Sequence, residues 1–390
     1  MRFELGSLDP VAPLDDLEPL LEVVGDARVV AVGESNHDVR EFGWVRHRVA
    51  RLLVERAGFD VVAFESGFAE GLAVDEWVRS GGAPVVEVAA RGLCYRFGEA
   101  AEVRDLLSWV RSFEGGVRFA GVDLPGSSGG ADRVWPVLAE FLAVADPGGS
   151  AVLERARRAV GSFAAVHSGL AMGRYAALSG AQRDAVGAVV GELLARVAGA
   201  VGERDRHAVA YWSARGVWAL EQFMRELVAG GARMVSRDAY MAGVVRWLLE
   251  RWPGSRIVLL VHNGHAQRVV LPVGGGAEVV PAGAQLDSVL GAGYRAVAVT
   301  CEAGTTTGLT MDAAAPGGLW LHEAPLPPVE VGSVEAWLAG RGAVGVDVRG
   351  LREGPSSIRH AEGFVATPVA AAFDAVVQVP RVRPSDFVLG

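Results

Sequence analysis

The stretch VVAVGESNH, residues 29–37, passes from a short apolar run through one glycine into polar side chains. Four later runs end in the same way, at Glu65, Asp123, His262 and Glu302. Near-continuous apolar runs of this length are typical of parallel strands covered on both faces. Because amphipathic segments separate most of the runs, the sequence predicts an α/β fold with layers of helix around a mainly parallel sheet. Ligands bind at the carboxyl ends of such strands, where these polar residues are expected to converge.

The segment after the first run predicts the first crossover helix. Apolar residues recur at helical spacing from Phe42 to Leu53 and form one stripe. Arg46 falls inside this stripe, whereas His47 points away from it. A buried arginine is costly unless it contacts a carboxylate or a ligand. We therefore expect Arg46 to face the site, with Glu65 as its nearest carboxylate, and His47 to be a solvated surface residue.

A long helical stretch interrupts the β/α alternation. The strand signal disappears after residue 130, and helical patterns occupy residues 133–145, 153–166, 181–201 and 204–228. This predicts a helical cap, residues 131–231, inserted into a single domain, residues 1–390, and packed over the strand ends.

The remaining chain returns to the α/β pattern. Ser236 is a good N-cap for the next helix. A glycine-rich loop at residues 274–276, a hairpin around Leu319 and a last strand at residues 375–379 are expected after it.

Composition narrows the class of partner. The 390 residues are 51% apolar and carry a formal net charge of -9, which argues against a nucleic-acid or anionic-membrane surface and favours a small molecule. The two cysteines, Cys94 and Cys301, fit neither a disulfide framework nor a thiolate metal site. With no signal-peptide pattern and no apolar run long enough to span a membrane, we expect a cytoplasmic protein. Nothing in the sequence indicates the oligomeric state.

Asparagine is rare in this chain. Lysine is absent and isoleucine occurs twice, as expected from codons rich in G and C. The two asparagines, Asn36 and Asn263, each adjoin a histidine. We interpret both as retained for a specific hydrogen bond beside a catalytic histidine, in a substrate-binding role.

Two short motifs carry titratable groups. Glu34 and His37 are three residues apart, a spacing that lets the carboxylate fix the tautomer of the imidazole and support its charged form. His262 and His265 follow directly on an apolar strand. This second pair can bind a metal, or it can polarise a substrate oxygen without one.

A rival signal is the stretch GSSGG, residues 126–130, which matches the G-x-S-x-G nucleophile elbow with Ser128 as the nucleophile. The elbow requires a strand that runs straight into the serine. Three residues, Asp123, Leu124 and Pro125, follow the strand here, so a flexible loop is the favoured interpretation.

Three ordered blocks together resemble the erythromycin esterase family, which includes succinoglycan biosynthesis-like proteins. They are residues 30–65, with VGESNH, Glu41-Phe42, Arg46 and the strand before Glu65; residues 237–242, with Arg237-Asp238 and Met241-Ala242; and residues 262–268, HNGHAQR. The resemblance implies a three-layer α/β core with a helical cap, like that of the family and of ChaN-like proteins. It also implies hydrolysis of a macrolactone ester by water, in some members, without a covalent enzyme intermediate. We expect no cofactor and no metal.

Roles follow from the resemblance position by position. It implies that His37 is the general base, that Glu34 and Glu65 orient it and the water, that Arg46 is a site cation, and that His262 and His265 form the opposite wall. Polar residues near these blocks are expected to bind the substrate: Asn36, Asn263, Asp123, Arg237 and Arg268.

Departures from the family leave other functions open. Asn36 replaces the usual threonine, Asp38 replaces the usual glycine, and Gly243-Val244 replaces the common Glu-Asn. The first alternative is a non-hydrolytic tailoring step, such as an elimination, cyclisation or isomerisation, in natural-product biosynthesis. The second is a ChaN-like haem-binding or small-molecule-binding protein, with the paired histidines as axial ligands.

Overall fold

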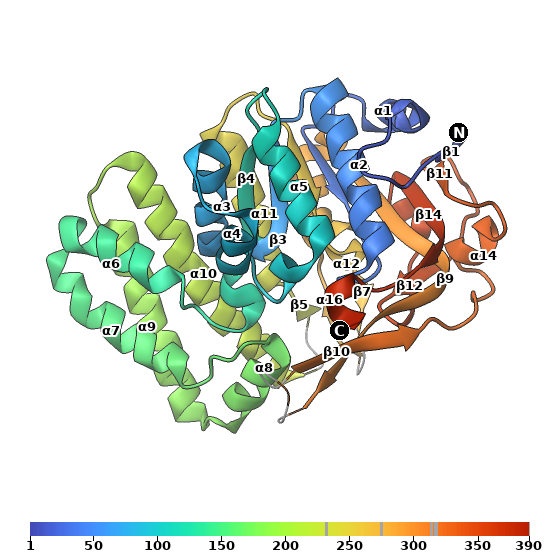
Figure 1. Ribbon diagram of the computed structural model, residues 1–390. Helices are drawn as coiled ribbons and strands as arrows, with labels where there is room; N and C mark the ends of the chain where they lie inside the picture. The colour runs from blue at the N-terminus through green and yellow to red at the C-terminus, as the bar shows by residue number, and fades with distance from the viewer. Residues whose placement is uncertain (231–232, 274–275, 313–314, 316–318, 390) are drawn as a thin grey trace.

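A mostly parallel sheet forms the centre of the molecule (Figure 1). The computed structural model describes residues 1–230, 233–273, 276–312, 315 and 319–389. In spatial order the strands are β1 (Arg2–Glu4), β11 (Val344–Asp347), β14 (Ala375–Val382), β9 (Tyr294–Met311), β2 (Val29–Val32), β6 (Ile257–Leu260), β3 (Val61–Gly67) and β4 (Arg118–Asp123). Pairing is parallel from β14 to β4, and antiparallel where β1 meets β11, β11 meets β14, and β10 (Leu319–Pro325) meets β9. The predicted α/β class is confirmed, including the hairpin at Leu319.

Alternation along the strands divides the core into two apolar layers. In β2, Val30 and Val32 pack on one face of the sheet, and Val29 and Ala31 pack on the other. The first face is covered by α1 (Pro19–Val24), α2 (Arg40–Ala57), α3 (Phe68–Ser80), α4 (Val85–Gly92) and α5 (Ala101–Ser112). The second is covered by α11 (Ser236–Arg251), α13 (Ala282–Leu290), α14 (Val334–Leu338) and α15 (Val369–Ala372). The result is a three-layer core.

Five further helices share an apolar cluster of their own, beyond the β4 side of the sheet (Figure 1). They are α6 (Val134–Ala145), α7 (Ser150–Gly161), α8 (Ser168–Ala177), α9 (Gly180–Gly199) and α10 (Arg204–Ala229). The sequence patterns gave four of them and missed α8. That this unit acts as a cap stays a prediction.

Short elements complete the chain. They are α12 (Asn263–Ala266), α16 (Asp386–Leu389), the hairpin of β12 (Ser357–His360) and β13 (Gly363–Ala366), and a small sheet of β5 (Arg233–Met234), β8 (Glu278–Val279) and β7 (Leu271–Pro272). The predicted glycine loop at 274–276 lies largely outside the described residues. No helix in the described part of the chain is long and apolar enough to cross a membrane.

Two local predictions are wrong. Ser236 is the first residue of α11 rather than its N-cap, because its hydroxyl donates to Glu226 Oε1, 2.7 Å away, and Val235 takes the cap position. His47 is only 4% exposed and packs beside Trp109, with a ring-centroid distance of 5.5 Å. Burial lowers the pKa of His47 to about 4, so it is a neutral packing residue. Helix α5 covers the face of α2 that the sequence pattern left to solvent.

Candidate active site

The carboxyl ends of four adjacent strands bring the predicted polar residues together. Glu34 follows β2, Glu65 lies in β3, Asp123 ends β4, and His262 follows β6. Arg237, from the first turn of α11, reaches into the same cluster. The expected convergence at one edge of the sheet is confirmed for these four strand ends. It is wrong for Glu302, which lies within the long strand β9 and accepts from the Gly340 N–H at 2.9 Å.

Glu34 and His37 form a direct pair. His37 Nδ1 donates to Glu34 Oε1 at 2.9 Å, and Arg46 NH1 lies 2.5 Å from the same oxygen. Burial by itself lowers the pKa of His37, but the nearby charges of Glu65 and Glu34 outweigh it and raise the pKa overall. Arg46 faces the site as expected, although its carboxylate is Glu34 and not Glu65.

Glu65 is the centre of the charge network. Its Oε1 accepts from Arg237 NH2 at 3.0 Å and lies 3.3 Å from His265 Nε2 and 3.7 Å from His37 Nε2. Its Oε2 accepts from the backbone N–H of His262 at 2.6 Å. Burial raises the pKa of Glu65, but the charges of His265, His37 and Arg237 hold it well below its ordinary value. Glu65 is therefore a permanent buried carboxylate.

Arg237 pairs with the carboxylates at the ends of two strands, Asp123 and Glu65. Its guanidinium makes a fork with Asp123, with Nε 2.9 Å from Oδ1 and NH2 2.7 Å from Oδ2. Asp123 is fully buried, so this bidentate pair is needed to hold a charge there. Arg237 and Asp123 thus join the site through each other and through Glu65, in a positioning role.

His265 is held in its charged form. Its Nδ1 lies 2.7 Å from Asp238 Oδ1, and its Nε2 faces Glu65, so carboxylates flank both ring nitrogens. Burial lowers the pKa of His265, but Asp238 and Glu65 raise it to about 10. Asp238 was not singled out from the sequence, although it is the second residue of the Arg237-Asp238 motif.

His262 is held neutral. Its Nε2 donates to the backbone oxygen of Ser35 at 2.9 Å, and its Nδ1 accepts from the backbone N–H of Gly264 at 3.0 Å. Burial, with the positive charges of neighbouring histidines, lowers its pKa well below the ordinary value. The His360 ring of β12 packs against it at a centroid distance of 4.6 Å. No sequence pattern linked His360, about a hundred residues later, to this site.

Both asparagine side chains bridge backbone segments. Asn263 is 2% exposed; its amide donates to the Val299 oxygen at 2.9 Å and accepts from the Val299 N–H at 3.3 Å. A Cβ atom on Gly33 would lie 2.0 Å from Asn263 Oδ1, so glycine is required there. Asn36 Nδ2 donates to Thr306 Oγ1 at 2.8 Å and to the Thr307 oxygen at 2.7 Å. These bonds tie the loops after β2 and β6 to β9. That Asn263 binds substrate stays a prediction.

Arg268 does not join the cluster. Its side chain pairs with Asp287 and Asp374 and lies beside the Tyr294 backbone oxygen. Tyr294 and Asp374 mark the amino ends of β9 and β14, which is the edge of the sheet opposite to the site. The structure therefore places Arg268 away from the other predicted site residues.

A cavity of about 730 Å³ opens on this cluster, and we name it the catalytic cavity. His37 lines it and has a side chain 29% exposed, against 6% for Glu34 and 3% for Glu65. The described lining also includes Asn36, Asp38, Tyr95 and Trp320. Burial raises the pKa of Asp38 to about 7. Among the cluster residues, His37 is thus the one best placed to meet a ligand.

Three alternatives, a metal site, a haem site and a serine nucleophile, can be compared with this geometry. Within the described residues, no group of three or more His, Cys, Asp or Glu side chains is arranged to hold a metal ion. An axial haem ligand needs a free imidazole nitrogen, and both nitrogens of His262 are engaged. Strand β4 ends at Asp123, five residues before Ser128, and Ser128 is fully buried. The nucleophile elbow therefore lacks its strand.

Comparison with known proteins agrees with the resemblance. The sequence model of the erythromycin esterase family matches residues 54–382. The chain is 26% identical to erythromycin esterase type II of Escherichia coli over 421 aligned residues, covering 100% of both, and 25% identical to erythromycin esterase type I of Escherichia coli, covering 96% of this chain and 95% of the relative.

Solved structures share the fold. A histidine-to-asparagine mutant of erythromycin esterase EreC, in its open conformation, superposes with a TM-score of 0.83 at 23% identity over 100% of this chain and 99% of that one. A succinoglycan biosynthesis protein superposes with a TM-score of 0.76 at 18% identity over 98% of this chain and 95% of that one. The family model matches most of the chain, and the sheet and its clustered strand ends agree with that match. This chain belongs to the erythromycin esterase family.

Proposed function

We propose that this protein hydrolyses an ester or macrolactone of a polyketide-like small molecule with a water molecule activated by His37. Family membership and relatives named as erythromycin esterases support an ester hydrolase acting on a macrolide-like substrate. The observation that carries the proposal is the position of His37. Its Nδ1 is fixed by Glu34, and its ring is more exposed than Glu34 or Glu65, so its Nε2 can receive a proton from a water in the cavity.

The proposed reaction begins with neutral His37. A water bound at Nε2 attacks the ester carbon as its proton passes to His37, and Glu34 stabilises the resulting imidazolium through Nδ1. The tetrahedral intermediate then expels the alkoxide, which takes the proton back from His37. The products are a carboxylic acid and an alcohol, and His37 is regenerated. General base catalysis of this kind contributes on the order of 10²–10⁴-fold in rate.

Charge on the developing oxyanion requires a cation or a donor. Arg46 lies behind Glu34, with a side chain only 7% exposed, so we assign it to positioning Glu34. The protonated His265 can contribute its fixed positive charge, but both of its ring nitrogens face carboxylates, so we assign it no hydrogen bond to the oxyanion.

The departures from the family fall in two places. Asn36 and Asp38 line the catalytic cavity. Gly243 instead packs on the Trp212 ring, where an added Cβ would lie 2.9 Å from the ring, and Val244 is fully buried in the core. We therefore expect the loop of Asn36 and Asp38, and not the Gly243-Val244 pair, to alter the choice of substrate.

The test is a mass-spectrometric screen of the purified protein against macrolides and other lactones. We expect one class of lactone to gain the mass of one water, and the His37→Ala variant to lose this activity. Loss of water from a substrate, or a new product of unchanged mass, would instead support the tailoring reaction, which the same acid–base groups can perform. A Soret band on the purified protein would support the haem-binding alternative.

A further inference from the structure

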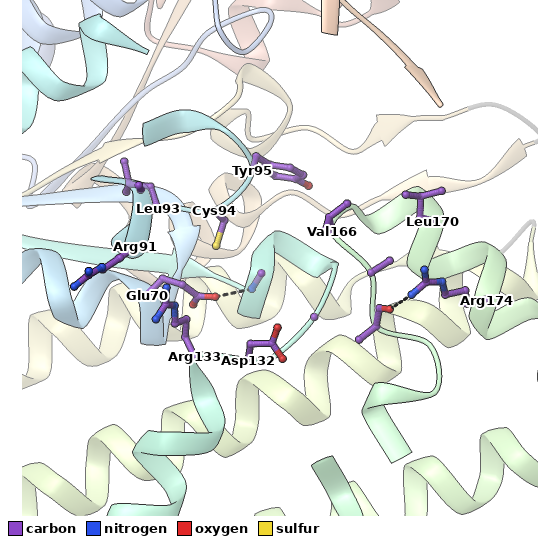
Figure 2. A pocket seen from close by; sticks show the side chains of 15 residues that line it. Glu70, Arg91, Leu93, Cys94, Tyr95, Asp132, Arg133, Val166, Leu170 and Arg174 are labelled. Carbon is purple, nitrogen blue, oxygen red and sulfur yellow. Dashed lines mark hydrogen bonds between the residues drawn. The ribbon is translucent and has the colours of Figure 1, made fainter. Parts of the chain in front are cut away.

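A second cavity adjoins the catalytic cavity. It has a volume of about 780 Å³, and we name it the arginine chamber after the residues described below. Tyr95 and Val166 line both cavities, so these two side chains lie between the two spaces. Figure 2 shows the arginine chamber, with Tyr95 and Val166 along one side of it.

Three arginines from separate elements line the arginine chamber. Arg91 comes from α4, Arg133 directly precedes α6, and Arg174 comes from α8 (Figure 2). In the part of the chain that the structure describes, none of them forms an ion pair with a carboxylate, and Arg174 donates to the backbone oxygen of Ala164. This differs from Arg46 and Arg237 at the active site, whose charges are neutralised by carboxylates.

Acidic groups do not cancel this charge. The described lining contains two of them, Asp132 and Glu70, against three arginines, so it is net positive even when both are ionised. Glu70 is 6% exposed, and its Oε1 accepts from the Gly126 N–H at 2.9 Å. Burial also raises the pKa of Glu70, which favours its neutral form. A chain with a net charge of -9 thus has a locally positive cavity next to its candidate active site.

Tyr95, which lines both cavities, and its hydrogen-bond partner Ser127 have an unusual backbone. Tyr95 has a φ of 50° and Ser127 a φ of 42°, both in the left-handed region that side chains rarely adopt. The Tyr95 hydroxyl donates to the Ser127 oxygen at 2.8 Å, which joins the two residues. The Tyr95 ring is thereby fixed between the cavities.

We propose that the arginine chamber binds a carboxylate on the substrate, while the scissile ester lies at His37. This inference rests on the proposed function and adds to it the class of substrate: a lactone or ester that carries an acid group on an arm long enough to pass Tyr95. Guanidinium groups bind carboxylates through paired, charge-assisted hydrogen bonds. A substrate with a cationic arm would be repelled from the same place.

The experiment compares two series of 4-nitrophenyl esters of increasing length. One series consists of monoesters of dicarboxylic acids, and the other of neutral esters of the corresponding monocarboxylic acids. At the length that reaches the arginine chamber, we expect the anionic ester to have a KM on the order of tenfold lower than its neutral partner. Added salt should reduce this preference, because exposed arginines are screened.

Arginine variants test whether the chamber causes the preference for the anionic ester. Arg91→Gln and Arg133→Gln should each remove most of the preference for the anionic ester. Arg157→Gln, which removes an arginine 60% exposed on α7, should leave the preference intact. Equal or higher KM for the anionic ester at every length, or a preference that survives both chamber variants, would overturn the proposal.

Failure of the proposed function gives a separate signal. If no ester of either series is hydrolysed, calorimetric titration with the free dicarboxylic acids still tests whether the arginine chamber binds a carboxylate. Binding by the wild type that is weakened by Arg133→Gln but not by Arg157→Gln supports the chamber without esterase activity. No binding by the wild type would overturn it.

Discussion

Glu65 shows how single side chains determine the charge states of this site. One buried carboxylate lies near Arg237, His265 and His37, while Asp238 supplies the second negative charge beside His265. The two histidines of the HNGH motif therefore differ: His265 is charged and His262 is neutral. A sequence pattern treats them as equivalent, and only their partners separate them.

The pH dependence of turnover tests the pairing of His37. A general base acts when unprotonated, so activity should fall as the pH decreases through the pKa of His37, which its carboxylates raise above 6.5. Replacing Glu34 by Gln removes one of these charges and should move the acid limb of the kcat/KM profile to lower pH. An acid limb at the same pH in both enzymes would show that Glu34 does not act on His37.

Asn263 is expected to contribute to stability. In Asn263→Asp the carboxylate cannot donate to the Val299 oxygen, and it adds a charge at a position only 2% exposed. We expect a loss of about 1–3 kcal/mol in the free energy of unfolding, measured by urea denaturation at neutral pH. This differs from the interpretation made from the sequence, in which the asparagine is retained to act beside a catalytic histidine. Unchanged stability with a shifted pH–rate profile would restore that interpretation.

At the scale of elements, close contacts between backbones fix the distance between layers. A Cβ on Gly71 of α3 would lie 2.3 Å from the backbone nitrogen of Gly121 in β4. The helix can therefore pack directly on the strand that ends in Asp123.

Substitution of Gly71 measures this contact. Gly71→Ala forces α3 away from β4 and should cost about 1–3 kcal/mol in the free energy of unfolding. Gly191→Ala, in α9, is the control, because nothing lies within 4 Å of its added Cβ. That variant should gain up to about 1 kcal/mol, as expected for alanine in a helix. Equal stabilities of the two variants would contradict the packing argument.

The turn after β4 decides against a serine nucleophile. Ser128 lies in the 3-10 turn Pro125–Ser128, and the next helix, α6, begins only at Val134. Incubation with a fluorophosphonate probe should therefore leave the protein unlabelled, as read by intact-protein mass spectrometry. A stoichiometric adduct on Ser128 would replace the His37 mechanism with an acyl-enzyme.

At the scale of the whole molecule, periodicity predicted the layers well. Strand runs and helical stripes depend on local spacing. The expectation that polar residues at the carboxyl ends of parallel strands lie together is correct for Glu34, Glu65, Asp123 and His262. The sequence patterns did not predict the contacts between distant segments. The pairing of Arg237 with Glu65, the packing of His360 on His262 and the burial of His47 each depend on where another element comes to lie, which the local pattern does not contain.

The mechanism proposed above depends on His37 as the base that activates water. Its most direct test is kcat/KM of His37→Asn against the wild type on the lactone found in the screen, with circular dichroism to confirm that the variant is folded. His37 lies in a loop and is partly exposed, so the fold should persist, while kcat/KM should fall by at least about 10²-fold. A folded variant that retains more than about a tenth of the wild-type kcat/KM would contradict the account, since a general base that contributes this much cannot be dispensable.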